Sequence, residues 1–240
     1  MKGNAIIWDF DGTLVDSRQK NLSVNRALIA HVTGKPADSF PLLRSQELFE
    51  AADARSNNWR DFYLVDFGLS EAETAEAGRL WTEFQLQDQT PMPLFPGINE
   101  ALTGLGDLPQ GIVSQNSRAM IQATMAQAGL EQYIETVIGY EEVPLDRQKP
   151  DPAGLLTCLE KLTQLRPGAA FYIGDWQTDA LQAVKARQVI QERGLAIALI
   201  SIGAFYGGTA GDDAWSTRFD VSVQHPGEIV QIVRDSLAQV

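Results

Sequence analysis

The chain begins with a short apolar segment that ends in two carboxylates and a glycine. Residues 5–12 read Ala-Ile-Ile-Trp-Asp-Phe-Asp-Gly, so Asp9 and Asp11 stand two positions apart. A continuous apolar run of this length is typical of a strand that is buried on both faces of a parallel sheet. Two acids at its end repel each other unless something cationic lies between them. The segment therefore predicts a buried strand whose carboxyl end carries a charged site.

Further apolar segments alternate with helix-like segments along the rest of the chain. The expected strands cover residues 5–10, 110–114, 136–139, 170–174, 195–203 and 219–223. The expected helices between them cover residues 97–106, 117–129, 151–165 and 178–193. This alternation predicts an α/β fold, a Rossmann-like parallel sheet with helices on both faces. Open sheets of this kind bind their ligands at the carboxyl ends of the strands.

One region interrupts the alternation with helices alone. We expect residues 17–91 to form an inserted helical domain, and residues 1–16 and 92–240 to form the α/β core. Ser70 and the acidic residues that follow it are typical of a helix N-terminus. The expected helices of the insert cover residues 21–31, 42–54, 59–67 and 70–89. Because the insert follows the first strand directly, we expect it to act as a lid over the carboxyl end of that strand.

Composition narrows the classes of partner. The 240 residues carry a formal net charge of −12, which argues against nucleic acid as a partner. No apolar run approaches the ~18 residues of a membrane span, so we expect no membrane partner. The single cysteine, Cys158, has no partner for an internal disulfide, which is consistent with a cytoplasmic location. The composition leaves open whether the protein is a monomer or a homodimer.

Polar residues follow several of the expected strands and one loop. Because these strand ends meet at one edge of a parallel sheet, their side chains are expected to gather there. Carboxylate oxygens in this number suit Mg²⁺, and a lysine and a hydroxyl suit a phosphate beside it. The residues concerned are Asp9, Asp11, Ser114, Lys149, Asp175 and Asp179.

These residues stand in four motifs whose order and spacing cover the whole chain. The sequence resembles the haloacid dehalogenase superfamily in its phosphatase branch, and the helical insert resembles the cap of the phosphoglycolate-phosphatase-like group. The motifs are Asp9-Phe10-Asp11-Gly12-Thr13-Leu14-Val15-Asp16, Val113-Ser114-Gln115-Asn116, Lys149-Pro150 and Gly174-Asp175-Trp176-Gln177-Thr178-Asp179.

The resemblance implies catalytic and metal-binding roles. Asp9 would be the nucleophile that forms an aspartyl-phosphate, and Asp11 would protonate the leaving oxygen and then activate water. Mg²⁺ would be held by Asp9, by the backbone carbonyl of Asp11 and by Asp175. Asp179 would contact the metal through water or orient Lys149, whose ammonium would balance the charge of the nucleophile and the phosphoryl group.

The resemblance also implies a phosphate-binding set. Ser114 and turn amides near Gly12 and Gln115 would hold phosphate oxygens, together with Lys149, and Thr13 would orient the first loop. In motif two, Gln115 separates the hydroxyl from the asparagine that follows it directly in many relatives. In motif four, Trp176 replaces the small hydroxyl residue that the family commonly has, and its indole would shield the metal loop or narrow the pocket.

The expected function is that of a Mg²⁺-dependent phosphatase for a small phosphorylated metabolite, such as phosphoglycolate or a sugar phosphate. Asp11 argues against a dehalogenase, and Thr13 favours a phosphatase over mutases that often carry valine there. Phosphonate-cleaving members need a Schiff-base lysine in the cap, where only Lys20 and Lys35 are present, and neither has a local reason for a depressed pKa. Two alternatives remain, a phosphotransferase or mutase of the superfamily and a non-catalytic phosphate-binding regulatory protein.

Overall fold

The computed structural model describes residues 3–53, 55–56, 58–208, 211 and 215–238. Within these residues six parallel strands form one sheet in the order β3-β2-β1-β4-β5-β6. The strand order turns back between β1 and β4, which is where parallel α/β sheets bind ligands. The strands are β1 (Ala5–Trp8), β2 (Gln110–Val113), β3 (Thr136–Ile138), β4 (Gly168–Gly174), β5 (Ile197–Ala204) and β6 (Val221–Val223).

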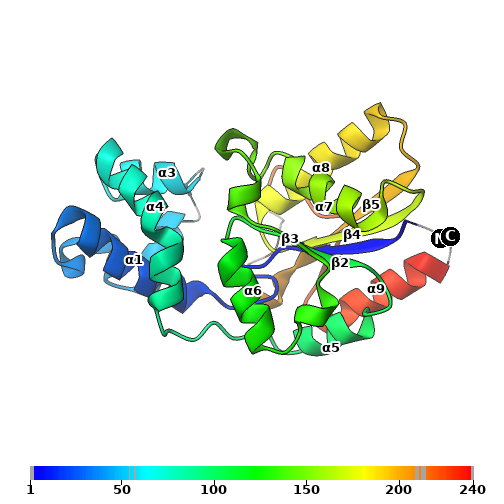
Figure 1. The fold of residues 1–240 in the computed structure, drawn as a ribbon, viewed down its shortest axis with the longest axis horizontal. Coiled ribbons are helices and arrows are strands. Elements are labelled where there is room, and N and C mark those ends of the chain that lie inside the picture. The colour runs from blue at the N-terminus through cyan, green and yellow to red at the C-terminus, as the bar shows by residue number, and fades with distance from the viewer. Residues whose placement is uncertain (1–2, 54, 57, 209–210, 212–214, 239–240) are drawn as a thin grey trace. The chain divides into compact units, whose positions relative to one another are not determined.

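Helices cover both faces of this sheet. Figure 1 shows α7 and α8 along one face and α5 and α9 along the other. Every residue of β1 is fully buried, which explains its continuous apolar sequence. These findings confirm the predicted α/β fold. The helices of this part are α5 (Ile98–Gly104), α6 (Arg118–Gln127), α7 (Ala153–Thr163), α8 (Gln177–Glu192) and α9 (Pro226–Ala238).

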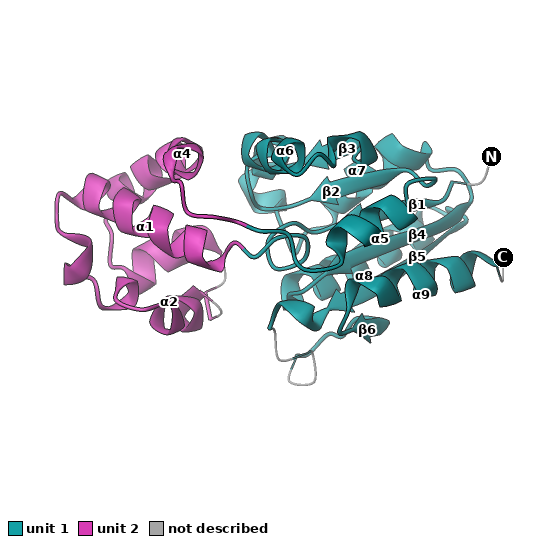
Figure 2. Ribbon diagram, turned by 90° about the horizontal axis from the view of Figure 1, so that it is seen from below, with its two compact units in different colours: residues 1–16, 93–240 teal, residues 17–92 magenta. Residues whose placement is uncertain are grey.

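The chain divides into two compact units, shown in different colours in Figure 2. Unit 1 comprises Met1–Asp16 and Pro93–Val240 and contains the sheet. Unit 2 comprises Ser17–Met92. None of the described helices is both long and apolar enough to cross a membrane.

Unit 2 is helical, and its core is rich in aromatic side chains. Phe62 lies between Phe49 and Phe67, with ring centroids 5.4 and 5.0 Å away. Ser70 and Glu73 form the capping box that begins α4, where an N-terminus was expected. The helices of this unit are α1 (Arg18–Thr33), α2 (Gln46–Asp53), α3 (Trp59–Asp61) and α4 (Glu71–Gln87).

Two expected helices of unit 2 differ from the structure. The helix expected over residues 42–54 begins only at Gln46, because the Ser45 hydroxyl accepts a hydrogen bond from the Leu48 N–H and so caps the helix there. Residue 54 lies outside the described residues. The helix expected over 59–67 is α-helical only in α3, and continues as a π-helix over Phe62–Asp66.

Candidate active site

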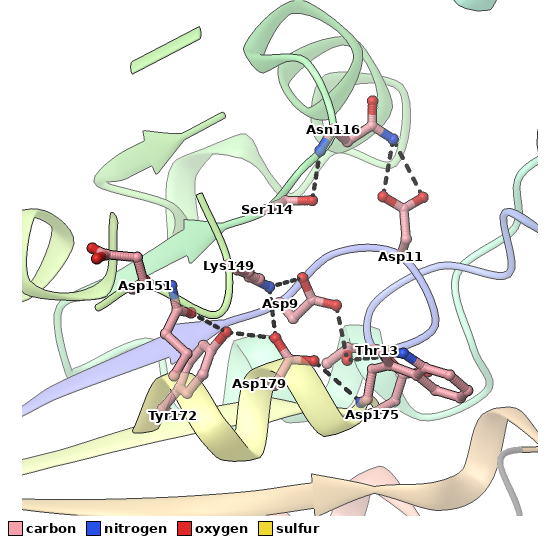
Figure 3. Close-up of polar contacts among 12 residues, drawn as sticks. Asp9, Asp11, Thr13, Ser114, Asn116, Lys149, Asp151, Tyr172, Asp175 and Asp179 are labelled. Atoms are coloured by element: carbon pink, nitrogen blue, oxygen red, sulfur yellow. Dashed lines mark hydrogen bonds and ion pairs between the residues drawn. The ribbon is translucent and has the colours of Figure 1, made fainter. Parts of the chain in front are cut away.

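The carboxyl ends of β1, β2 and β4 carry the predicted site residues. Asp9 follows β1 directly, and its N–H donates to the Ile173 carbonyl of β4 over 2.7 Å. Ser114 follows β2 and donates from its N–H to the Ile138 carbonyl of β3 over 3.0 Å. These backbone hydrogen bonds extend the sheet by one residue and so fix the backbone positions from which the Asp9 and Ser114 side chains project. Figure 3 shows the resulting group around Asp9.

Gly12 allows the first loop to approach motif four closely. Its φ angle is +80°, a left-handed conformation that glycine adopts without strain. A Cβ atom at this position would lie 2.2 Å from Oδ2 of Asp175. Any side chain at position 12 would therefore displace the Asp175 carboxylate, so the glycine is needed to bring motifs one and four together.

Lys149 connects the first and last motifs by ion pairs. Its ammonium donates to Oδ1 of Asp9 and, over 2.7 Å, to Oδ1 of Asp179. All three side chains are buried, and Figure 3 shows the contacts among them. Burial alone would lower the pKa of Lys149, but the carboxylates of Asp179 and Asp9 outweigh it and hold that pKa above its usual range. The lysine is therefore a permanent cation inside the unit.

The pKa of Asp9 is also raised, to about 7. Burial is the largest cause of the rise, the charge of Lys149 opposes it, and the carboxylates of Asp179 and Asp11 add to it. A positive charge bound at these carboxylates would favour the ionised form of Asp9, which is the form that can attack phosphorus.

Three carboxylates form a group that fits a hard divalent cation. One ligand oxygen each from Asp9, Asp175 and Asp179 lies within 4.8 Å of the other two. An all-oxygen donor set of this kind suits Mg²⁺. Asp11, also expected at the metal, contributes no side chain to this group among the described residues.

Thr13 lies between two of these acids. Its hydroxyl is 3.5 Å from Oδ2 of Asp9 and 3.4 Å from Oδ1 of Asp175. The side chain is fully buried and follows the Gly12 turn. The predicted orienting role of Thr13 in the first loop is consistent with this position, because the hydroxyl can donate to either carboxylate.

The other residues of the predicted phosphate-binding set gather at one small pocket. Ser114, Gln115 and Lys149 line it together with Gln148. The Ser114 hydroxyl accepts a hydrogen bond from the N–H of Asn116 over 3.0 Å, and Gln115 is exposed. The structure therefore brings the expected hydroxyl, amide-bearing turn and lysine to one place.

Asn116 holds the second acid of motif one, a contact that the sequence analysis did not predict. Its side-chain amide donates to both carboxylate oxygens of Asp11, over 3.3 and 3.1 Å. The Asn116 side chain also accepts from the N–H of Ser117 over 2.8 Å. The available signal was its place in motif two, but the spacing along the chain gives no direction for the side chain.

Tyr172 is a second site residue that the sequence did not reveal. It lies on β4, fully buried, with its hydroxyl 2.7 Å from Oδ1 of Asp179 and 2.8 Å from Oε1 of Gln182. Gln182 in turn donates to the Asp151 carbonyl over 2.8 Å. A tyrosine within an apolar strand gave the only hint, and it resembles ordinary core packing at the sequence level. Asp179 is thus held by both Lys149 and Tyr172.

Trp176 is the N-cap residue of α8. Its N–H donates to Oδ2 of Asp179 over 3.1 Å. Its indole packs edge-to-face on Trp215, with ring centroids 5.6 Å apart. Trp215 also contacts Phe205 and Phe219, so motif four is tied to the chain that follows β5.

Comparison with known proteins defines the class to which this fold and site belong. The sequence profile of the haloacid dehalogenase-like hydrolases matches residues 6–189, more than half of the chain. The chain therefore belongs to the haloacid dehalogenase-like hydrolase family, which confirms the resemblance seen in its motifs.

Individual relatives and solved structures extend over nearly the full length. An N-acetylmuramic acid 6-phosphate phosphatase from Pseudomonas putida is 26% identical, over 99% of each chain. A phosphoglycolate phosphatase from Synechococcus elongatus is 28% identical, over 98% of this chain and 99% of the relative. The solved structure of a haloacid dehalogenase-like hydrolase from Streptococcus pneumoniae has a TM-score of 0.70 at 20% identity, over 95% of this chain and 97% of that one. That structural similarity shows the shared fold.

Proposed function

We propose that this hydrolase is a Mg²⁺-dependent phosphatase that cleaves a small phosphomonoester through an aspartyl-phosphate. The observation that carries the proposal is the buried network of Asp9, Lys149 and Asp179, with Asp175 beside it, at the carboxyl edge of the sheet. A carboxylate nucleophile, a permanent cation and a set of oxygen ligands are the groups that phosphoryl transfer requires.

In the proposed reaction Asp9 and Asp11 divide the chemistry. A carboxylate oxygen of Asp9 attacks phosphorus, so a phosphorus–oxygen bond forms to Asp9 as the bond to the leaving oxygen breaks. Asp11 gives its proton to that leaving oxygen and then takes a proton from the water that cleaves the aspartyl-phosphate. The amide of Asn116 fixes the Asp11 carboxyl between these steps.

The remaining residues bind and balance charge. Lys149 offsets the charge of the phosphoryl group, and Ser114 with the turn amides near Gly12 and Gln115 holds its oxygens. Asp9, Asp175 and Asp179 would hold Mg²⁺, which when bound neutralises negative charge on phosphoryl oxygens. Tyr172 keeps the Asp179 carboxylate directed toward Lys149.

The proposed substrate is a small phosphorylated metabolite. The names of the two relatives support this, because N-acetylmuramic acid 6-phosphate and phosphoglycolate are both small molecules that join a phosphate to a carboxylic acid. Phosphoglycolate and sugar phosphates are therefore the first candidates. We further propose that unit 2 serves as the helical cap of the family and that the enzyme works in the cytoplasm.

The proposal is tested by p-nitrophenyl phosphate hydrolysis with Mg²⁺ and with EDTA. Asp9→Asn should lower the metal-dependent rate by roughly a thousandfold or more, since it removes the nucleophile. Asp107→Asn is a matched control, because Asp107 is a surface partner of Arg234 and its loss should leave the rate unchanged. A panel of phosphorylated carboxylic acids and sugars then identifies the substrate. Release of phosphate that persists in Asp9→Asn would contradict the proposal.

A further inference from the structure

The segment after β5 contacts the loop that carries the nucleophile. β5 ends at Ala204 and continues into a 3-10 turn over Phe205–Gly207. From this turn the Tyr206 hydroxyl donates a hydrogen bond to the backbone carbonyl of Thr13 over 2.7 Å. Tyr206 belongs to none of the four motifs, and 193 positions separate it from Thr13 in the sequence.

The ring of Tyr206 supports the same loop from a second direction. It packs edge-to-face on Phe95, with ring centroids 5.5 Å apart. The N–H of Phe95 donates to the Leu14 carbonyl over 3.0 Å, and Val15 forms an isolated bridge to Leu94. The tyrosine therefore contacts both the chain that leaves motif one and the chain that returns to unit 1.

The turn itself packs closely on the Gly12 peptide. A Cβ atom on Gly207 would lie 3.0 Å from the Gly12 carbonyl oxygen and 3.0 Å from Cζ of Phe95. This tight approach leaves little freedom for the motif-one loop on the side where Tyr206 lies.

Thr13 is therefore held both at its backbone carbonyl and at its side-chain hydroxyl. Tyr206 holds its carbonyl, while its hydroxyl lies 3.5 Å from Asp9 and 3.4 Å from Asp175. Asp11 stands two positions before Thr13, on the same loop. A shift of the Thr13 peptide would move Asp11 relative to Asp9, which is anchored separately through the β1–β4 ladder and Lys149.

We propose that Tyr206 is a positioning residue for the hydrolytic reaction, which holds the motif-one loop so that Asp11 stands at the leaving oxygen. This inference rests on the proposed function, in which Asp11 is the proton donor. Tyr206 touches no reacting atom and acts only through the Thr13 carbonyl. Its loss should therefore impair proton donation more than attack by Asp9.

Leaving groups separate these two effects. p-Nitrophenolate departs without a proton, whereas the more basic phenolate of phenyl phosphate needs one from the general acid. Tyr206→Phe removes the hydroxyl and keeps the ring on Phe95. We expect it to lower kcat/KM, which covers only the steps up to formation of the aspartyl-phosphate, about tenfold for phenyl phosphate and less than about threefold for p-nitrophenyl phosphate.

Tyr63→Phe provides the matched control. Tyr63 is a buried tyrosine of unit 2 whose hydroxyl lies 3.0 Å from Oδ1 of Asn25. Tyr63→Phe should lower the thermal unfolding temperature about as much as Tyr206→Phe and leave the ratio of the two kcat/KM values unchanged.

The same measurements distinguish a failure of the Tyr206 proposal from a failure of the proposed phosphatase function. Equal losses with both esters, or no loss with either, would show that Tyr206 has only a structural role and would overturn the inference while the proposed function stands. A wild-type protein that hydrolyses neither ester would overturn both.

Discussion

Each unit of the molecule contains a buried lysine, and the two lysines have different surroundings. Lys149 of unit 1 is 9% exposed and Lys20 of unit 2 is 4% exposed. A buried ammonium is stable only when paired with an anion or with hydrogen-bond acceptors. Both lysines meet this requirement, so burial alone does not show which one has a catalytic role.

The carboxylates around the two lysines differ. Lys149 bonds two acids, Asp9 and Asp179, and both belong to the group of three whose oxygens lie within 4.8 Å. Such crowding of carboxylates favours a bound cation and keeps the site reactive. Under the proposed function, the lysine of unit 1 belongs to the site that binds metal and phosphate.

Lys20 belongs to a local structural pair instead. Its ammonium donates to the Asp88 carbonyl over 2.7 Å and lies 3.5 Å from Oδ1 of the same residue. The Asp88 carboxylate also accepts from the Ser23 hydroxyl over 2.6 Å and from the Thr90 N–H over 2.8 Å. These bonds join the start of α1 to the end of α4. Of the two buried lysines, only Lys149 is therefore contacted by more than one acid in these ion pairs.

The largest expected effect comes from removing each lysine in turn. Lys149→Met should lower kcat by about a hundredfold or more, because the phosphoryl charge loses its fixed counter-charge. Lys20→Met should keep kcat within about twofold but lower the free energy of unfolding by about 3 kcal/mol, because it leaves Asp88 without its cation. Steady-state kinetics and chemical denaturation measure the two effects. A similar loss of kcat in both variants would show that the lysines do not differ as described.

Metal binding should distinguish the acids around Lys149 from Asp88, the partner of Lys20. Mg²⁺ at a hundred times its dissociation constant should raise the free energy of unfolding by about 2.7 kcal/mol, because it binds only the folded site. Asp175→Asn should abolish this stabilisation, whereas Asp88→Asn should retain it. Thermal unfolding with Mg²⁺ and with EDTA gives the measurement. An equal response of both variants to Mg²⁺ would place the metal elsewhere.

Acid titration gives the smallest expected effect. Although burial opposes it, hydrogen bonds from Ser23 and Thr90 and the charge of Lys20 lower the pKa of Asp88 below its ordinary 3.8. The resulting stabilisation, about 1 kcal/mol or less, is fully present above pH 3.8 and is lost as the pH falls through the lower folded pKa. Denaturant unfolding of wild type and Asp88→Asn across this range should converge at low pH. If the difference between their free energies of unfolding stayed constant with pH, the ionised Asp88 carboxylate would not be the source of the stabilisation.

Much of the fold could be predicted from local patterns. Strands of a parallel sheet are buried on both faces, so β1, β2 and β4 stand out as apolar runs, each ending in a polar residue. The C-terminal helix α9 was not predicted. Helix boundaries in unit 2 depended on a single hydroxyl at Ser45 and on aromatic packing around Phe62, and neither follows from periodicity.

Some residues of the candidate site were likewise predictable from local patterns, and others were not. Residues at strand ends were predictable because the topology of a parallel sheet brings those ends together, and the structure places Asp9, Ser114 and Asp175 accordingly. Asn116, Tyr172 and Tyr206 were missed because their importance lies in the direction of a side chain. Only the folded chain shows that Tyr206 reaches back to Thr13.

The position of β1 in the sheet has a consequence for biosynthesis. β1 comes first among the described strands, yet Ile6 pairs with Gln110 on one side and with Phe171 on the other. The strand that precedes Asp9 therefore lacks its first neighbour until residue 110 has been synthesised and its second until residue 171. Unit 2 lies in the sequence between β1 and both of these partners, so its residues are synthesised before either partner. The nascent chain thus exposes an apolar, unpaired strand for much of synthesis. Such segments are prone to aggregate unless chaperones bind them.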